Sequence, residues 1–296
     1  MNKARQCGEG VPEHYINQYL QQGFCLLEGL IPSALIEAAW QRVQEIIDHP
    51  PDWPSGHFQV LDPAEYCSAS GDPLPKGMQR PGLEESVFAA VAEHPNLSQA
   101  MAALLGGEVE LFTDQIGVKH GRIQTEQGDR SFFHQDSWYW KIEPQLGCNC
   151  WIPMHKVGED AIALSVMPGS HTNWVLTPHE SYYDDPPMFS GSPQGGYAPF
   201  KRHRIPLDQI DPTREVPVEM SAGDGLFFST ILGIEANPTV PVRQWPSTPS
   251  PINDGQTVEE LEQDFDNLVA ECLPALMTRT RKVVPGATPK ENVAVG

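Results

Sequence analysis

The sequence predicts an α+β protein, mainly β, in which helices come first and short strands follow. The 25 glycines and 29 prolines predict many turns, which suits a β-rich enzyme better than a helical bundle. Helical spacing of apolar residues occurs before residue 106 and again over 257–277, and short apolar runs bounded by turn residues lie between these two regions. A length of 296 residues with 40% hydrophobic residues is enough for a sizeable core, and we expect residues 1–296 to form a single domain.

Residues 12–105 form the predicted helical part. The helix expected from Ile31 to Ile47 has its apolar residues at helical spacing and ends before Pro50 and Pro51. The other elements predicted here are a helix over 12–22, a strand over 24–27, a long loop over 51–82, and short helices near 83–93 and 97–105.

Residues 106–243 form the predicted β core. Its expected strands cover 109–119, 131–142, 148–154, 161–166 and 226–232. The segment 177–203 contains repeated Pro and Gly, and a loop of this length in a compact domain is typical of a lid or binding loop.

The C-terminal region predicts one more helix, over 257–277, with an apolar stripe and an acidic opposite face. Arg279, Arg281 and Lys282 follow it and suit the negative end of a helix dipole. This helix either packs on the outer wall or forms a dimer contact. Residues 285–296 are expected to be a disordered tail.

The net charge of −20 argues against nucleic acid and anionic membranes as partners. The sequence contains no apolar run of 18 residues and no signal-like apolar stretch after Met1, so we expect a cytoplasmic protein with no membrane span. Six scattered cysteines fit free thiols in a reducing compartment. Cys148 and Cys150 are either core thiols or a soft metal pair.

The most informative segment is the aromatic run that contains His134 and Asp136. Residues i and i+2 of a strand point to one face, so this spacing predicts an imidazole beside a carboxylate. Such a pair is two thirds of a 2-His-1-carboxylate triad for non-haem Fe(II), and the alternative is a buried polar pair in a core strand. A third, distal histidine would complete the triad, but His203 is the last histidine of the chain.

Three segments together resemble the phytanoyl-CoA dioxygenase family: His134 to Trp140, Ala163 to His171 with its Pro-Gly-Ser-His turn, and Ala222 to Phe228. The opening from Tyr19 to Ile31 is also similar to that family, and the resemblance spans roughly residues 12–243. It implies a double-stranded β-helix (jelly roll) core with flanking helices. It also implies an Fe(II)/2-oxoglutarate-dependent oxygenase that acts on a small molecule, with His134 and Asp136 as metal ligands and catalytic residues.

The distal part of the family pattern is His-x-Ser-x-x-Asn followed by an Arg. Asn237 and Arg243 match its end, which puts Leu232 at the place of the His, whereas counting from Phe228 puts Gly233 there. Neither residue is a ligand. Glu235 is the candidate replacement, through a bulge in the strand, and His171, His179 and His203 are weaker candidates.

The resemblance also suggests the remaining site residues. Arg243 would bind the distal carboxylate of 2-oxoglutarate in a fork, and Lys119 and Gln115 would line the cosubstrate pocket. Phe132, Trp138 and Trp140 share the strand face of His134, so they would either wall a pocket for an apolar substrate or pack in the core.

The sequence therefore predicts an oxygenase for a small, apolar organic molecule. Two alternatives stay open because of the missing histidine. One is an inactive or repurposed family member that serves as a binding or partner subunit, in a homodimer or with a paralogue. The other is an isomerase that uses the same pocket without 2-oxoglutarate.

Overall fold

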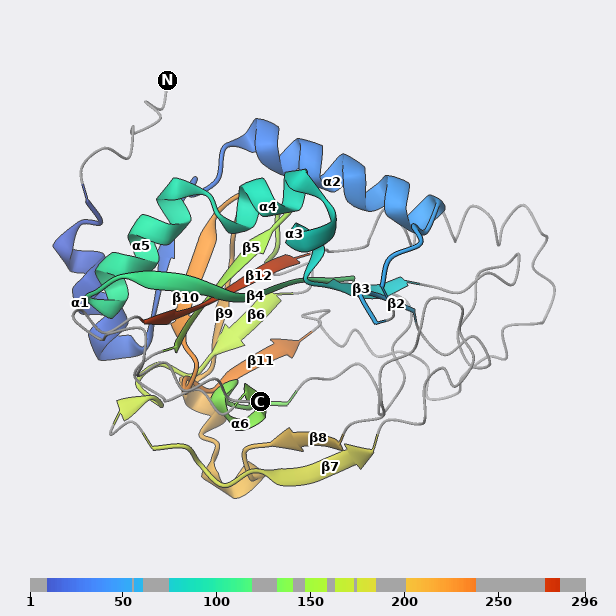
Figure 1. The fold of residues 1–296 in the computed structure, drawn as a ribbon. Helices are drawn as coiled ribbons and strands as arrows, with labels where there is room; N and C mark the ends of the chain where they lie inside the picture. The colour runs from blue at the N-terminus through green and yellow to red at the C-terminus, as the bar shows by residue number, and fades with distance from the viewer. Residues whose placement is uncertain are drawn as a thin grey trace, which may run out of the picture.

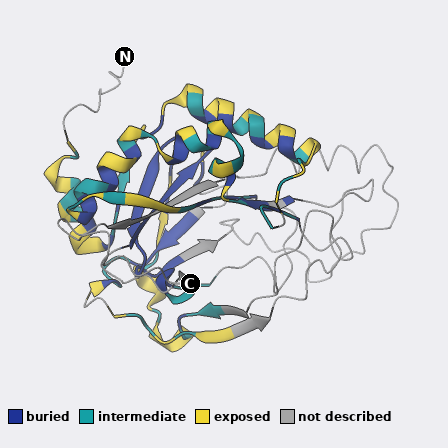
Figure 2. Ribbon diagram, in the orientation of Figure 1, coloured by how far each residue is buried: buried dark blue, intermediate teal, exposed yellow. Residues whose placement is uncertain are grey.

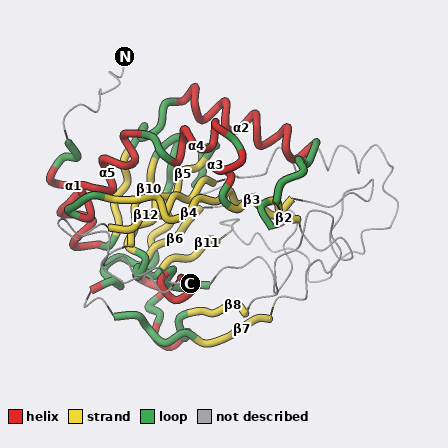
Figure 3. The backbone as a smooth tube through the Cα atoms, in the orientation of Figure 1, coloured by secondary structure: helices red, strands yellow, loops and turns green. Residues whose placement is uncertain are grey.

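The structure is a computed structural model that describes residues 10–54, 56–60, 75–118, 132–140, 147–158, 163–172, 175–184, 201–237 and 275–282. It has three layers: helices, a seven-stranded antiparallel sheet, and a three-stranded antiparallel sheet (Figure 1). Figure 3 shows the helices that precede residue 106 gathered on one side of the strands.

The large sheet joins strands from both ends of the chain. Its order is β1 (Phe24–Leu27), β10 (Gly225–Ser229), β5 (Gly147–Pro153), β12 (Ala275–Lys282), β4 (Val109–Gly117), β3 (Pro75–Gln79) and β2 (Phe58–Val60). The small sheet has the order β11 (Ile234–Asn237), β6 (Ala163–Val166) and β9 (Val216–Val218). A separate hairpin pairs β7 (Glu180–Asp184) with β8 (Lys201–Arg204).

Helices cover one face of the large sheet. They are α1 (Glu13–Gln22), α2 (Ser33–Asp48), α3 (Pro81–Glu84), α4 (Ser86–Ala92) and α5 (Pro95–Leu105). The short elements α6 (Ser137–Trp140), η3 (Leu207–Gln209) and η4 (Pro212–Arg214) lie in the later part of the chain. Helix α2 buries Ile36, Ala39, Val43 and Ile46, which recur at the three- and four-residue spacing of one helix face. Figure 2 shows the exposed outer surface of these helices and the buried strands beneath them.

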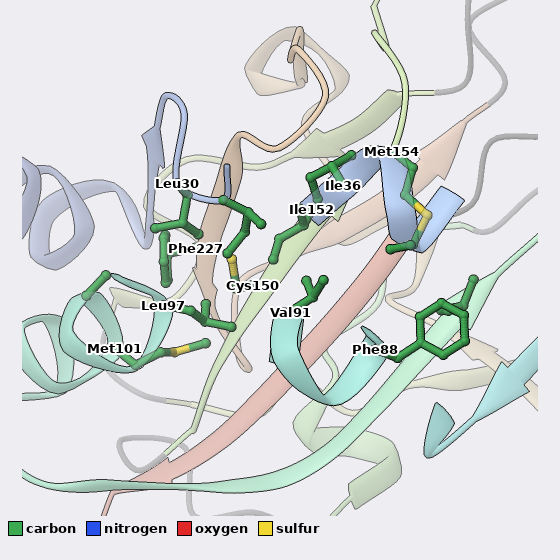
Figure 4. Close-up of a cluster of buried hydrophobic side chains, with 14 of the residues drawn as sticks. Leu30, Ile36, Phe88, Val91, Leu97, Met101, Cys150, Ile152, Met154 and Phe227 are labelled. Carbon is green, nitrogen blue, oxygen red and sulfur yellow. The ribbon is translucent and has the colours of Figure 1, made fainter. Parts of the chain in front are cut away.

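Two hydrophobic cores lie on the two faces of the large sheet. Along β10 and β5 the side chains alternate between them: Phe227 and Cys150 pack with the helices (Figure 4), whereas Phe228 and Trp151 pack toward the small sheet. Full burial of a Leu, Ile or Phe side chain contributes roughly 1.5–3 kcal/mol. The second core therefore holds the two sheets together, and one of its members, Ile234, pairs with a residue of the site described below.

Most predicted elements are confirmed within a few residues. They are the strand over 24–27, the helices before residue 106, and the strands predicted to begin at residues 109, 148, 161 and 226. The predicted loop over 51–82 is wrong in part, because β2 and β3 lie within it and add an edge to the large sheet. The predicted loop over 177–203 likewise contains β7 and β8. Among the described residues, no helix is long and apolar enough to cross a membrane.

Two predictions fail for specific reasons. The strand over 131–142 is wrong in its described part, 132–140: this part has an isolated bridge at His134 and no strand, and the backbone turns at Asp136 into the single turn of α6, with Ser137 N–H bonded to the carbonyl of Thr230. Residues 131, 141 and 142 lie outside the described residues. The helix over 257–277 is wrong at its end, because residues 275–277 belong to β12 and pair on both sides. Such pairing outweighs a weak helical preference. Residues 257–274 and 285–296 lie outside the described residues.

Candidate metal centre

His134 stands at the edge of the small sheet, next to β11. Its backbone exchanges two hydrogen bonds with Ile234, each with an N···O distance of 3.0 Å. The preceding residue, Phe133, is anchored by the N–H of Ile205, which donates to the Phe133 carbonyl at 2.7 Å. The backbone of His134 is therefore fixed from both sides.

The imidazole of His134 has a defined orientation. Nδ1 lies 2.8 Å from the carbonyl oxygen of Phe132, and since a carbonyl only accepts, Nδ1 carries the hydrogen. In the neutral imidazole the lone pair is then on Nε2, and this atom lies 3.6 Å from Oδ1 of Asp136. That distance is too long for a hydrogen bond, so Nε2 lies beside a carboxylate oxygen without being hydrogen-bonded to it. A nitrogen and an oxygen donor therefore lie side by side, as the ligands of a divalent cation do.

Asp136 is held on its other oxygen. The carboxylate is 3% exposed, and its Oδ2 accepts a hydrogen bond from the side-chain amide of Asn149 on β5. Asn149 is fully buried, and its own Oδ1 has no hydrogen-bond partner. A ligating carboxylate usually has its second oxygen bonded in this way, because the partner fixes the direction of the first.

The residue between His134 and Asp136 ties two loops to the site. The Gln135 amide donates to the carbonyls of Ile231 (2.7 Å) and Val175 (3.3 Å), and its Oε1 accepts from the N–H of Thr177 (2.8 Å). Because Gln135 is 1% exposed, these bonds satisfy a buried amide, and they fix the chain on either side of the His-x-Asp pair.

His179 is a structural histidine. Its Nδ1 donates to the carbonyl of Thr177 (2.6 Å), and its Nε2 accepts the N–H of Gln135 (3.0 Å). Burial, together with the neighbouring His134 and His203, lowers the pKa of His179 to about 4, against the bonding of Thr177. Both ring nitrogens are committed, so the suggestion that His179 supplies the third ligand is not supported. His171 bonds the carbonyl of Leu20 (3.1 Å) and serves the packing of α1.

Aromatic residues surround the pair, but not in the way a strand would place them. Trp138 stacks on His179, with ring centroids 4.7 Å apart, and Tyr139 presents its edge to His134 at 5.8 Å. The Tyr139 hydroxyl bonds the backbone of His203. Phe132 lies under the guanidinium of Arg204, 4.7 Å from its ring centroid. The side chain of Trp140 lies outside the described residues.

The structure places two of the other predicted residues. Gln115 on β4 lies opposite Met277, which in turn lies opposite Trp151, so position 115 is on the sheet face that carries the second core. Glu235 lies opposite Ser165 on β6, so its position is on the other face of the small sheet from His134. The expected bulge is absent from this described pairing, and the register does not bring Glu235 beside the pair. Lys119 and Arg243 lie outside the described residues.

Sequence reasoning missed Arg279, which it placed after a helix. On β12 this residue lies opposite Asn149 of β5 and Thr113 of β4. Directly paired residues occupy the same face of a sheet, so position 279 lies beside the amide that holds Asp136. The alternation of Thr278 and Thr280 with Met277, Arg279 and Arg281 was the available signal for a strand.

The residues present fit a divalent metal in part. His134 Nε2 and Asp136 Oδ1 are a nitrogen and an oxygen donor of the kinds that Fe(II) accepts. Within the described ranges, however, no three His, Cys, Asp or Glu side chains come together as a metal site. The described part of the chain thus offers a two-residue site.

A family model described as phytanoyl-CoA dioxygenase matches residues 19–233. The fold is similar to that of the epimerase SnoN solved with Fe3+, alpha ketoglutarate and nogalamycin RO, at 12% identity and a TM-score of 0.56, over 93% of this chain and 91% of that one. It is also similar to EctD from S. alaskensis with bound Fe (12% identity, TM-score 0.60, 95% of this chain and 80% of that one).

A third similar structure is AviO1 from Streptomyces viridochromogenes Tue57, at 16% identity and a TM-score of 0.55, over 95% of this chain and 99% of that one. A search of curated proteins found no match. At these identities the solved structures establish likeness of fold.

Proposed function

We propose that this chain, which belongs to the phytanoyl-CoA dioxygenase family, is an Fe(II)/2-oxoglutarate-dependent oxygenase that acts on a small, apolar organic molecule. One observation carries the proposal: Nε2 of His134 lies 3.6 Å from Oδ1 of buried Asp136, side by side with it but too far away for a hydrogen bond. A polar pair that served packing alone would be expected to close its own hydrogen bond.

Each residue of the site has a distinct task. His134 Nε2 and Asp136 Oδ1 would hold the metal, while the Phe132 carbonyl and the Asn149 amide keep those two atoms directed at it. Fe(II) with 2-oxoglutarate and O2 would supply the oxidising chemistry. Gln135 fixes the backbone of the pair, so that the two donors keep their separation when a ligand binds.

The cosubstrate is an anion, and a protein with a net charge of −20 needs a local cation to bind it. We propose Arg279 as that cation, because β12 places its position beside Asn149 on the face of the second core. Arg243 is the alternative from the sequence pattern. Lys119 and Gln115 keep their proposed places in the lining of the cosubstrate pocket.

For the substrate, we propose contact with Phe132, Trp138 and Trp140. Phe132 and Trp138 belong to the aromatic surroundings of the pair, which favour an apolar molecule. The names of SnoN, from nogalamycin biosynthesis, and of EctD with 5-hydroxyectoine connect this fold with small molecules. A role in secondary metabolism fits those names.

We further propose that the two facing sheets form the jelly roll of the family and that the chain folds as one domain. The second core, shared by both sheets, supports this arrangement. A homodimer, or a dimer with a paralogue, remains part of the proposal.

A second candidate function is favoured by Ile234, an apolar residue paired directly with His134. This second candidate is either an altered family member that acts as a partner subunit or an isomerase that needs no 2-oxoglutarate. The first alternative predicts a paralogue that co-purifies, and the second predicts turnover without 2-oxoglutarate or O2.

The decisive experiment is an anaerobic Fe(II) titration of the whole protein with 2-oxoglutarate, followed by the weak visible charge-transfer band of the Fe(II) chelate. We expect the band in the wild type and its loss in His134→Ala and Asp136→Ala, while His14→Ala on exposed α1 serves as the control. Absence of the band and of Fe(II) binding in the wild type would refute the oxygenase proposal.

The same titration assigns the anion-binding residue. In Arg279→Ala, the 2-oxoglutarate concentration that gives half of the maximal band intensity should rise at least tenfold, on the order expected for the loss of a charge-assisted hydrogen bond. Lys282→Ala is the matched control on the same strand. If Arg243→Ala has the large effect instead, the assignment of Arg279 is wrong.

A further inference from the structure

The pairing of His134 identifies its nearest neighbour on the interior face. His134 and Ile234 form an antiparallel bridge in which both N–H groups bond the partner's carbonyl at 3.0 Å. Residues paired in this way have Cα atoms about 5.5 Å apart and occupy one face of the sheet. On its other side Ile234 pairs with Val166 of β6, so Val166, Ile234 and His134 form one row.

The surroundings of Ile234 are apolar. It is 3% exposed and belongs to the second core, together with Leu232, Phe228 and Trp151. An isoleucine of this kind fills the space beside the imidazole and offers no donor atom. Leu232 and Gly233, which the sequence pattern had placed at this point, lie in the turn before β11: Leu232 N–H bonds the carbonyl of Ser229, and the Gly233 carbonyl accepts from Met167.

No other described residue takes over the role of a third ligand. Position 235 lies on the opposite face of the small sheet, and both nitrogens of His179 are bonded. The described ranges contain no cluster of three ligating His, Cys, Asp or Glu side chains.

We infer that Ile234 occupies the third ligand position of this site, so that the described part of the protein offers a divalent metal two ligands, His134 and Asp136, and the metal is retained only together with a chelating 2-oxo acid. This inference rests on the proposed function and adds to it an order of binding. A chelate supplies donors that the two-residue site lacks, and by linkage each partner then strengthens the binding of the other by the same factor.

The test uses the full-length protein without O2, with Co(II) as the probe in calorimetry and in visible absorption. The wild type should bind Co(II) weakly alone, and addition of 2-oxoglutarate should tighten binding about 5–150-fold, the usual range of coupling between two ligands. In Ile234→His, Co(II) should bind at least tenfold more tightly in the absence of 2-oxoglutarate, and the coupling should shrink.

Two controls separate position from chemistry. Leu232→His introduces the same imidazole into the same apolar core two residues away, and should leave Co(II) affinity at the wild-type level. Ile234→Val keeps the position apolar and should do the same. Should Ile234→His fail to fold by circular dichroism, Ile234→Gly with free imidazole supplies the ligand from solution, and imidazole should then tighten Co(II) binding.

The outcomes distinguish this inference from the proposed function. Tight Co(II) binding by the wild type without 2-oxoglutarate overturns the inference and leaves the oxygenase proposal standing. Tight binding by Ile234→His, with none by the wild type under any condition, overturns the inferred joint binding of metal and 2-oxo acid and refutes the oxygenase as well. A folded Ile234→His, or Ile234→Gly with imidazole, that binds no better than the wild type overturns the inference.

Discussion

Asn149 of the large sheet donates a hydrogen bond from its side-chain amide to Asp136. Asp136 lies two residues after His134, whose backbone pairs with Ile234 of the small sheet, so this buried hydrogen bond connects the two sheets at the candidate metal centre. The bond leaves Oδ1 of Asp136 facing His134. The direction of the carboxylate is thus set from β5, on the opposite side of the second core.

Replacement of this amide should weaken the metal site. In Asn149→Ala, metal affinity measured in the presence of 2-oxoglutarate should fall about 10–100-fold, as for other partners of metal ligands. The unpaired carboxylate should also cost about 1–3 kcal/mol in urea unfolding. Ser165→Ala is the control: its buried hydroxyl has no partner, so its removal should not lower stability. Unchanged metal affinity in Asn149→Ala would show that Asn149 does not orient Asp136.

His179 should make the fold sensitive to acid. Its pKa is about 4 in the folded protein and about 6.5 in an unfolded chain, so between these values the unfolded state binds a proton that the folded state does not. The contribution of His179 is therefore fully present above pH 6.5 and is lost as the pH falls toward 4.

Urea unfolding at a series of pH values checks this, with His179→Gln as the comparison, because glutamine keeps an acceptor for the Gln135 N–H and does not titrate. The variant should lose part of the decline in stability between about pH 6.5 and 4. Identical slopes for the variant and the wild type would rule out His179 as the source.

Gln135 should be a major stabilising residue although it is polar. Gln135→Ala removes three hydrogen bonds, including those to the carbonyl of buried Ile231 and to the N–H of half-buried Thr177. We expect a loss of about 2–4 kcal/mol in the free energy of unfolding. Gln21→Ala, on the exposed surface of α1, should stay within about 0.5 kcal/mol of the wild type. A small effect at Gln135 would mean that water replaces these bonds.

Gly23 and Gly29 form a matched pair for a steric test. Both have positive φ, 85° and 60°, which disfavours alanine. A Cβ at Gly23 would lie 2.6 Å from His171 and from Leu232, whereas a Cβ at Gly29 would meet nothing within 4 Å. Gly23→Ala should therefore cost about 1–3 kcal/mol more than Gly29→Ala, which thermal unfolding can measure. Equal losses would show that the core yields at Gly23.

The sequence was sufficient to single out His134 and Asp136 as candidates, because their spacing and the aromatic run around them are local features, and their role as metal ligands stays a prediction. It failed at Trp138, because a bond from Ser137 to Thr230, far away in the chain, turns the backbone into α6. Beyond such a turn, the alternation of a strand no longer predicts which side chains share a face. The role of Asn149 was likewise hidden, since only the packing of two sheets brings it to Asp136.

Register was the other limit. Counting from Phe228 or from Asn237 gave two places for the missing ligand, Gly233 and Leu232, and the pairing of β11 with His134 gives a third, Ile234. The two counts disagree because they cross the turn between β10 and β11, and no local sequence pattern gives the length of that turn. Arg279 was missed for a related reason: the apolar residues before it fit a helix, while the partners of β12 are far away in the sequence.

The position of β12 has a consequence for how the chain matures on the ribosome. This strand, at residues 275–282, inserts between β4 and β5 in the middle of the large sheet, although both neighbours are synthesised more than a hundred residues earlier. Until it emerges, β4 and β5 each present an open edge to other chains. Nascent or truncated protein that ends before residue 275 should therefore depend on chaperones and aggregate readily, and the large sheet can be completed only after synthesis has passed residue 282.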